Sequence, residues 1–244
     1  MKAGITRKKS EPKTIAESLA ELRKHAEEHR PTNVACEECS QVFTVSRHPQ
    51  RVYANFVCDE CCERRAKREI EADKESSWKE ICPPLYLNTD QSRLPRNLLR
   101  KAVEWRFSPK GILVAGNTGK GKTRAIWQGL RVQHSEGRSI IALDSTEFGR
   151  EVAKRYGENP ADAVRWLESL IKCDILFIDD LGKEKLTERT ATELFGVIEG
   201  RVKQLRPIFA TTNLSGAALK ASLSPDRGEP LHRRLVDFCE LVVV

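Results

Sequence analysis

The sequence lacks a long apolar run and an apolar leader. No stretch of about 18 consecutive apolar residues occurs in its 244 residues, which excludes a transmembrane helix of ordinary composition. The first thirteen residues are polar and basic, and they lack the apolar centre of a secretory signal. From these two absences we expect a cytoplasmic protein that does not act on a membrane.

The composition shows no large deficit that would prevent folding. Hydrophobic residues make up 39% of the chain and charged residues 32%, so a packed core can form and the chain is not disordered throughout. Forty-two basic residues against 35 acidic ones give a net charge of +7. This mild excess permits an anionic partner without demonstrating one.

Eight cysteines are unevenly distributed, and five of them lie between Cys36 and Cys62. Disulfides are rare in a reducing compartment, so a metal site is the better explanation for the cluster. Two C-x-x-C pairs are separated by 18 residues, which is a spacing typical of a closed, structural zinc site. The predicted Zn²⁺ ligands are Cys36, Cys39, Cys58 and Cys61. A redox C-x-x-C pair is the alternative, while Cys62 is a possible substitute for Cys61 and His48 a less favoured ligand.

The flanking sequence predicts a small N-terminal domain. We expect a disordered basic tail over 1–13, an amphipathic helix over 14–30, and a zinc ribbon within 14–62 whose hairpin pairs 41–45 with 52–57. Opposite charges three and four residues apart over 63–81 predict a solvated helical linker. We interpret 14–62 as a partner-docking domain and 82–244 as a second, larger domain.

Residues 82–244 alternate short apolar runs with amphipathic segments. The runs at 112–115, 140–143, 175–178, 207–210 and 241–244 predict five buried strands, and the segments near 122–136, 145–157, 161–172 and 188–205 predict helices. This alternation is typical of an α/β fold with a five-stranded parallel sheet covered on both faces.

A phosphate-binding loop follows the first of these strands. The sequence G-N-T-G-K-G-K-T matches G-x-x-x-x-G-K-[ST] and precedes a predicted helix, as the motif requires. Its backbone N–H groups are expected to hold the phosphates of ATP or GTP, with Lys122 on the β- and γ-phosphates and Thr123 on Mg²⁺. The predicted loop residues are Gly116, Asn117, Thr118, Gly119, Lys120, Gly121, Lys122 and Thr123.

Polar residues at later strand ends complete the predicted site. Asp179 is expected to hold Mg²⁺ through water, and Asp180 to orient or deprotonate the attacking water; capping of a turn is the alternative for both. Asn213 follows the fourth strand and suits either a γ-phosphate contact or a turn cap. Arg233 and Arg234 suit either a neighbouring subunit's nucleotide or a solvated surface.

The motifs GNTGKGKT, ILFIDDLG, IFATTNLS and LHRRL, in this order, resemble the AAA+ ATPases of the DnaC/DnaI helicase-loader and IstB transposition-helper group. This resemblance covers about residues 82–244. It implies a five-stranded ASCE core that hydrolyses ATP at subunit interfaces, with Asn213 as sensor 1 and Arg234 as arginine finger, or else Arg233. Asp180 replaces the glutamate of many wider AAA+ relatives, which implies slow turnover. Ten residues after Arg234 are too few for a helical lid.

The resemblance also implies partners. It implies a replicative helicase bound by the zinc-containing domain, self-association through the ATPase domain, and single-stranded DNA along 145–172. There Arg150, Lys154 and Arg155 supply charge and Phe148 and Tyr156 supply rings, although a plain solvated helix fits as well.

We therefore predict an ATP-dependent loader of a replicative helicase. An IstB-like transposition helper and a non-hydrolysing ATP-binding adaptor are the alternatives. A monomeric nucleotide kinase is less suitable because the sequence shows no lid or acceptor pocket.

Overall fold

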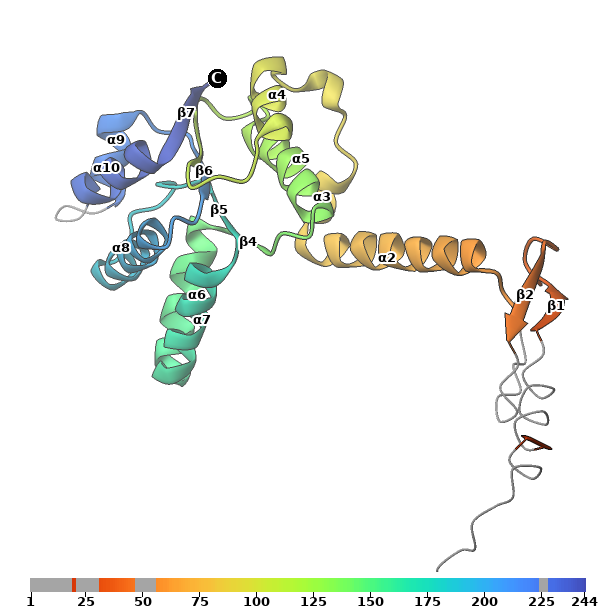
Figure 1. Cartoon of the computed structure of the whole chain (residues 1–244). Helices are drawn as coiled ribbons and strands as arrows, with labels where there is room; N and C mark the ends of the chain where they lie inside the picture. The colour runs from red at the N-terminus through yellow and green to blue at the C-terminus, as the bar shows by residue number, and fades with distance from the viewer. Residues whose placement is uncertain (1–18, 21–30, 47–55, 224–227) are drawn as a thin grey trace, which may run out of the picture. The chain divides into compact units, whose positions relative to one another are not determined.

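The computed structural model describes residues 19–20, 31–46, 56–223 and 228–244 (Figure 1). They belong to two compact units, Met1–Ala72 and Asp73–Val244, and helix α2 (Asp59–Ile81) crosses from one to the other. The expected tail over 1–13, almost all of the helix over 14–30, and His48 lie outside the described residues. The charged linker is helical, and its helix begins before Cys61 rather than after Cys62.

The first unit contains a hairpin that differs from the expected one. Strand β1 (Pro31–Ala35) pairs antiparallel with β2 (Val42–Ser46), and Ala35 lies opposite Val42. Most of the segment 52–57 lies outside the described residues, so its predicted pairing with 41–45 stays a prediction; the β1–β2 pairing is one that the sequence did not predict. The chain reverses at the first C-x-x-C itself, where Ser40 N–H donates to the Cys36 carbonyl at 2.8 Å and Ser40 adopts a φ of 60°. The turn at the first C-x-x-C therefore closes the β1–β2 hairpin.

The second unit is built on a five-stranded parallel sheet, as predicted. Its strands lie in the order β4 (Ile140–Asp144), β5 (Ile175–Asp179), β6 (Ile208–Thr212), β3 (Gly111–Ala115) and β7 (Cys239–Val243). All four strand pairs are parallel. The carboxyl ends of β3, β5 and β6 therefore lie at the same edge of the sheet, where ligands bind in open α/β folds.

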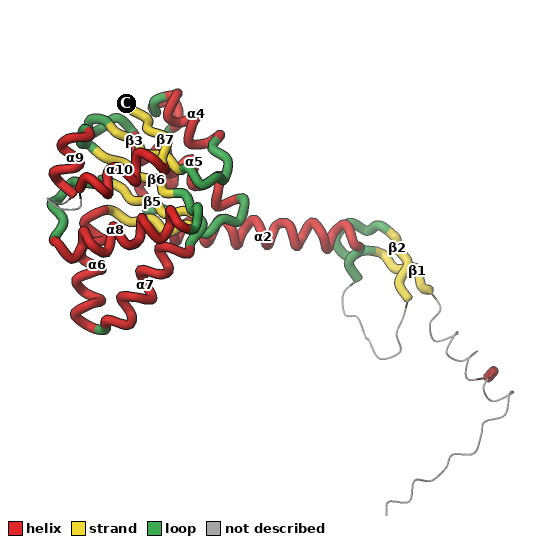
Figure 2. Tube along the Cα trace, turned by 60° about the vertical axis from the view of Figure 1, so that its left-hand side comes forward, coloured by secondary structure: helices red, strands yellow, loops and turns green. Residues whose placement is uncertain are grey.

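Helices cover both faces of this sheet, as Figures 1 and 2 show. One face packs on α4 (Arg96–Glu104) and α5 (Lys122–Ser135) around Ile112, Phe177 and Phe209. The other face packs on α6 (Ser145–Glu158), α7 (Pro160–Lys172), α8 (Glu188–Lys203), α9 (Gly216–Leu223) and α10 (Gly228–Phe238). The strands are apolar at successive positions because each of them contributes to two cores.

Helices α4 and α5 approach each other closely. A Cβ atom at position 129, in the middle of α5, would lie 2.5 Å from the Ala102 carbonyl oxygen. Glycine inside a helix costs about 1 kcal/mol relative to alanine. Here the close approach of the two backbones explains why Gly129 occupies the position.

Arg201 on α8 is fully buried and holds three elements together. Its guanidinium donates to the carbonyls of Leu170, Cys173 and Pro207 at 2.6–2.9 Å. These carbonyls lie at the end of α7 and before β5 and β6. A buried charge is tolerated where hydrogen bonds replace its hydration, and Arg201 thereby satisfies carbonyls that the end of α7 leaves unpaired.

Among the described residues, no helix combines the length and the apolar character needed to cross a membrane.

Candidate nucleotide site and metal centre

The phosphate-binding loop joins β3 to α5. Gly119 and Gly121 adopt φ values of 82° and 77°, a conformation that L side chains rarely take. Gly121 precedes the first residue of α5, so the unpaired N–H groups of the helix start face the loop. A Cβ atom on Gly121 would also meet the Leu94 side chain at 3.0 Å. Both the backbone conformation and the available space therefore require glycine there.

Lys122 is buried inside the loop, with only 5% of its surface exposed. Its Nζ donates to the carbonyls of Gly116 and Asn117 at 2.9 Å each and to Asn213 Oδ1 at 2.7 Å. Burial lowers the pKa of the Lys122 ammonium, and the charges of Asp179 and Asp180 oppose that shift. The three acceptors fix the ammonium at the loop, where Lys122 lines a cavity.

Asp179 ends β5 next to the first turn of α5. The hydroxyl of Thr123 donates to Asp179 Oδ1 at 2.8 Å, and the hydroxyl of Thr211 on β6 donates to the same oxygen. Burial raises the pKa of the Asp179 carboxyl, and the neighbouring charge of Asp180 raises it further. A cation favours the ionised carboxylate, and a hydroxyl beside a carboxylate fits the oxygen ligands that Mg²⁺ prefers.

Asp180 is held in an uncommon backbone conformation with a φ of 50°. Its N–H donates to Thr211 Oγ1 at 3.0 Å, and its carbonyl accepts from Ser145 Oγ at 2.9 Å. Asn213 Nδ2 donates to Asp180 Oδ1 at 3.3 Å, so Asn213 bridges Asp180 and Lys122. Such conformations persist where surrounding contacts fix them, and here they orient the carboxylate at the cavity.

A cavity of about 600 Å³ opens over these groups. Lys122, Thr123, Asp180 and Asn213 line one side of it. The other side comes from the segment between α2 and α4, which includes α3 (Pro84–Leu87) and a 3₁₀ turn at Gln91–Arg93. That side is lined by Leu85, Tyr86, Asn88, Asp90, Arg93 and Leu94.

Sequence reasoning missed this second wall because it carries no motif. Tyr86 stacks on Trp127 with ring centroids 6.0 Å apart, and the Arg124 guanidinium lies 5.5 Å from the Tyr86 ring. Arg124 also donates to the Leu85 carbonyl at 2.9 Å. The wall is therefore fixed to α5 by side chains far away in sequence. The only local signals are the prolines Pro83, Pro84 and Pro95, which mark a break without indicating a site.

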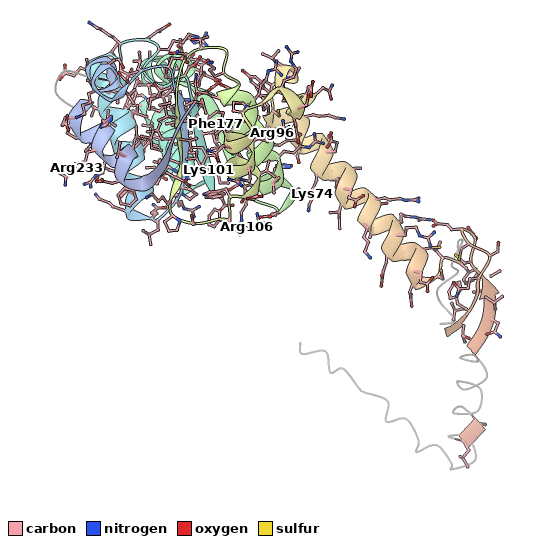
Figure 3. All side chains as sticks on the ribbon, turned by 90° about the horizontal axis from the view of Figure 1, so that it is seen from above. Lys74, Arg96, Lys101, Arg106, Phe177 and Arg233 are labelled. Carbon is pink, nitrogen blue, oxygen red and sulfur yellow. The ribbon has the colours of Figure 1, made fainter. Side chains whose placement is uncertain are left out.

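The two candidate finger arginines lie on α10 and are not among the residues that line the cavity of their own chain. Arg234 pairs with Glu199 of α8, whose side chain is 17% exposed. Arg233 is 77% exposed and lies 3.7 Å from Asp237. Figure 3 shows Arg233 on the α10 side of the unit.

Three of the five side chains assigned to a DNA groove over 145–172 are buried or engaged within the unit, whereas Arg150 and Lys154 are exposed. Phe148 is 2% exposed and packs in the core, so it cannot stack on a base. The Tyr156 hydroxyl donates to Glu193 at 2.8 Å, and Arg155 is bound by Glu151 and Asp162. Phe148 and Val152 are one helical turn apart and face the core together, which the helical period explains.

The four predicted zinc ligands converge in the first unit. The Sγ atoms of Cys36, Cys39, Cys58 and Cys61 all lie within 4.8 Å of one another, and those of Cys39 and Cys58 are 3.7 Å apart. Tetrahedral Zn²⁺ with Zn–S distances of about 2.3 Å places sulfurs about 3.8 Å apart. Cys62 is exposed and its Sγ donates to the Val57 carbonyl, so it does not belong to the cluster. The donor set fits a structural zinc ion.

The thiols of this cluster differ in acidity. The Cys58 N–H donates to Cys36 Sγ at 3.4 Å and lowers the pKa of Cys36 to about 6. Burial raises the pKa of Cys61. Four neighbouring thiols do not all ionise without a compensating cation, so metal binding would release protons from this cluster.

Comparison with known proteins gives structural matches only. No family model and no curated protein matches the sequence. The structure is similar to that of the DnaC helicase loader, with a TM-score of 0.53 and 20% identity over 69% of this chain and 98% of the other. It is similar to DnaI, with a TM-score of 0.56 and 18% identity over 66% and 94% of the two chains.

A third similar structure is AMPPCP-bound DnaA from Aquifex aeolicus, with a TM-score of 0.54 and 20% identity. That match covers 66% of this chain and half of the DnaA chain. At such identities the shared property is the fold. The second unit therefore has the α/β P-loop NTPase fold found in DnaC, DnaI and DnaA, and the first unit adds a four-cysteine cluster suited to zinc.

Proposed function

We propose that the second unit binds ATP with Mg²⁺ and hydrolyses it. The observation that carries this proposal is the meeting of Lys122, Thr123, Asp180 and Asn213 along one cavity, at the carboxyl edge of a parallel sheet. The phosphate-binding loop, the Asp180 carboxylate and the Asn213 amide follow three separate strands. The fold brings them together, as phosphoryl transfer requires.

Each residue has a distinct role in this proposal. The loop N–H groups and Lys122 bind the β- and γ-phosphates, while Thr123 and Asp179 hold Mg²⁺, which neutralises charge on the phosphate oxygens. Asp180 orients the attacking water and accepts its proton. Asn213 already spans the lysine and this carboxylate, so it holds the two groups at a fixed separation.

Calorimetry with Mg·ATP and a phosphate-release assay test the roles separately. We expect Lys122→Ala to abolish ATP binding, while the exposed Lys203→Ala on α8 binds normally. Asp180→Asn keeps the size of the side chain and removes the base, so binding should persist and turnover fall about 100-fold or more. Turnover that survives Asp180→Asn would show that another group activates the water.

We further propose that this ATPase loads a replicative helicase onto single-stranded DNA, with the zinc-containing unit binding the helicase. The fold shared with DnaC and DnaI supports this proposal, as does a DnaA match at 17% identity whose structure includes AMPPCP and single-stranded DNA. Co-purification with the host helicase tests it. Cys58→Ser should abolish this association, whereas Cys62→Ser should not.

Arg234 is proposed as a finger that acts on the nucleotide of a neighbouring copy, with Arg233 as the fallback. In the single chain Arg234 is paired with Glu199, so it would have to exchange that carboxylate for phosphate. A mixing experiment tests this role. Lys122→Ala and Arg234→Ala proteins should each be inactive alone, and mixing them should restore turnover because one supplies the finger and the other the intact site. No recovery would argue against Arg234.

The same assays separate the alternatives. Stimulation by duplex rather than single-stranded DNA would favour an IstB-like transposition helper. Tight ATP binding without turnover would favour an adaptor whose shape is fixed by the nucleotide.

A further inference from the structure

One short segment carries most of the protein's excess charge. Residues 91–110 contain six basic side chains and one acidic one, a net charge of +5, against +7 for the whole chain. The segment contains the 3₁₀ turn, α4 and the loop that leads into β3. Five of the basic side chains are exposed, namely Arg93, Arg96, Arg100, Arg106 and Lys110.

These five side chains differ from the basic residues of α7. On α7 the exposed bases are neutralised, because Arg165 pairs with Asp162 and Lys172 with Glu168. Among the described residues none of the five forms an ion pair, although hydrogen bonds from Ser92 and the nearby charge of Arg93 lower the pKa of the Asp90 carboxyl. The sixth base, Lys101, pairs with Glu240 of β7. The positive potential of the segment is therefore directed at solvent rather than cancelled internally.

Two of the five bases lie on α4, and the other three flank it in the chain. Arg96 and Arg100 are four residues apart and share a face of α4, and Arg93 precedes them at the edge of the nucleotide cavity. Figure 3 shows Arg96, Lys101 and Arg106 together on the α4 side of the unit, away from Arg233. A 9-residue helix is about 14 Å long, enough to contact several successive phosphates.

The loop after α4 is rigid, so Arg106 and Lys110 occupy defined positions. Trp105 Nε1 donates to the Lys110 carbonyl at 3.0 Å, and the Trp105 ring packs edge-on against Phe209 at 4.9 Å in the core. Arg106 Nη1 donates to the Glu104 carbonyl at 3.2 Å. These contacts reduce the entropy that the loop would lose on binding a ligand.

The same loop presents an aromatic ring at the surface. Phe107 is 37% exposed, although the Arg138 guanidinium lies 4.1 Å from its ring centroid and Trp105 contacts it at 6.0 Å. An exposed ring in the same loop as Arg106 and Lys110 suits stacking with an unpaired base, which a duplex or an acidic peptide does not offer.

We propose that Arg93, Arg96, Arg100, Arg106, Lys110 and Phe107, here called the α4 surface, bind single-stranded nucleic acid. The bases follow the phosphates and Phe107 stacks on a nucleobase. This surface lies on a different helix from the 145–172 segment, whose rings are buried or engaged. The proposal does not depend on ATP hydrolysis or on a helicase partner.

Fluorescence anisotropy with labelled oligo(dT), on the zinc-replete full chain without nucleotide, tests the proposal. Arg96→Ala/Arg100→Ala should weaken binding about tenfold or more and reduce the slope of log affinity against log salt by about 1.4. Arg165→Ala/Lys172→Ala removes two exposed bases from α7 and should leave the affinity unchanged. The reverse pattern, or equal losses in both double variants, would overturn the α4 surface.

A second variant separates stacking from charge. Phe107→Leu keeps an apolar side chain and removes the ring, and it should weaken oligo(dT) binding about fivefold or more without changing the salt slope. If Phe107→Leu binds oligo(dT) with unchanged affinity, the proposed recognition of single strands is overturned. The same holds if polyglutamate displaces oligo(dT) at equal charge concentration. The oligo(dT) assay contains no nucleotide and calorimetry with Mg·ATP is a separate measurement, so failure of the nucleotide site and failure of the α4 surface are distinguishable.

Discussion

The two units reach a folded state by different physical routes. Among the described residues of the first unit, the buried cluster consists of Cys36, Cys58 and Cys61, with Phe43 and Val57 packed against it. The second unit has two extensive apolar clusters, one on each face of its sheet. A core of three cysteines buries too little apolar surface to offset the entropy of ordering its chain. We therefore expect the first unit to depend on a metal ion and the second to depend on packing.

Removing a metal ligand should produce the largest and most local effect. Structural zinc contributes about 10–16 kcal/mol in small domains, so Cys58→Ser should unfold the first unit and leave the second folded. Hydrogen exchange resolved by peptide would show protection lost over 31–46 and retained over 111–115 and 208–212. Cys62→Ser is the matched control, since Cys62 lies outside the cluster. Retained protection in the Cys58→Ser protein would mean that the hairpin is stable without zinc.

Truncating an aromatic side chain in the core of the second unit should reduce the stability of that unit alone. Phe209 is fully buried at the centre of the sheet, so Phe209→Ala should cost about 3–5 kcal/mol of unfolding free energy. Val243→Ala on β7 removes a side chain that is 73% exposed and should cost less than about 0.5 kcal/mol. Denaturant unfolding followed by tryptophan fluorescence measures both. Zinc content should stay unchanged, and its loss in Phe209→Ala would show that the units are not independent.

Of the three changes, acidification should have the smallest effect, and it should act on the stability of the second unit. Burial lowers the pKa of His134 on α5, where Nε2 lies 3.1 Å from Ser77 Oγ. The folded state then binds this proton less readily than the unfolded state, so stability is full above about pH 6.5 and declines as the pH falls toward the lowered value. His134→Gln should reduce that decline in the second unit. Burial also lowers the pKa of His232, so part of the slope should remain.

Features encoded by local spacing could be predicted from the sequence. The glycine loop, the paired acids after β5 and the two C-x-x-C pairs each act through neighbouring residues, and the structure brings each set together. Features set by distant packing could not. Strand β1 contains proline and asparagine and does not look like a strand, but the turn at Cys36–Ser40 brings it against β2. Tyr86 acquires its position only through Trp127 and Arg124.

Phe148 shows a different limit of sequence reasoning. A ring on an amphipathic helix can face solvent or core, and we expected Phe148 to stack on bases beside Arg150, Lys154 and Arg155. Its partner at i+4, Val152, is the residue that decides the orientation, because both lie on the buried stripe. Phe107 is the opposite case, a ring in a loop with no helical period to place it, and it remains exposed.

The close contact between Gly129 and Ala102 has a mechanical consequence. With no side chain between their backbones, α4 and α5 have little freedom to slide, so we expect a tilt of α5 to move α4 with it. Helix α5 starts at Lys122, and α4 carries Arg96 and Arg100. A nucleotide that reorients α5 would thus change the affinity of the α4 surface for single-stranded nucleic acid. By thermodynamic reciprocity, bound single-stranded nucleic acid would change the affinity for the nucleotide by the same factor.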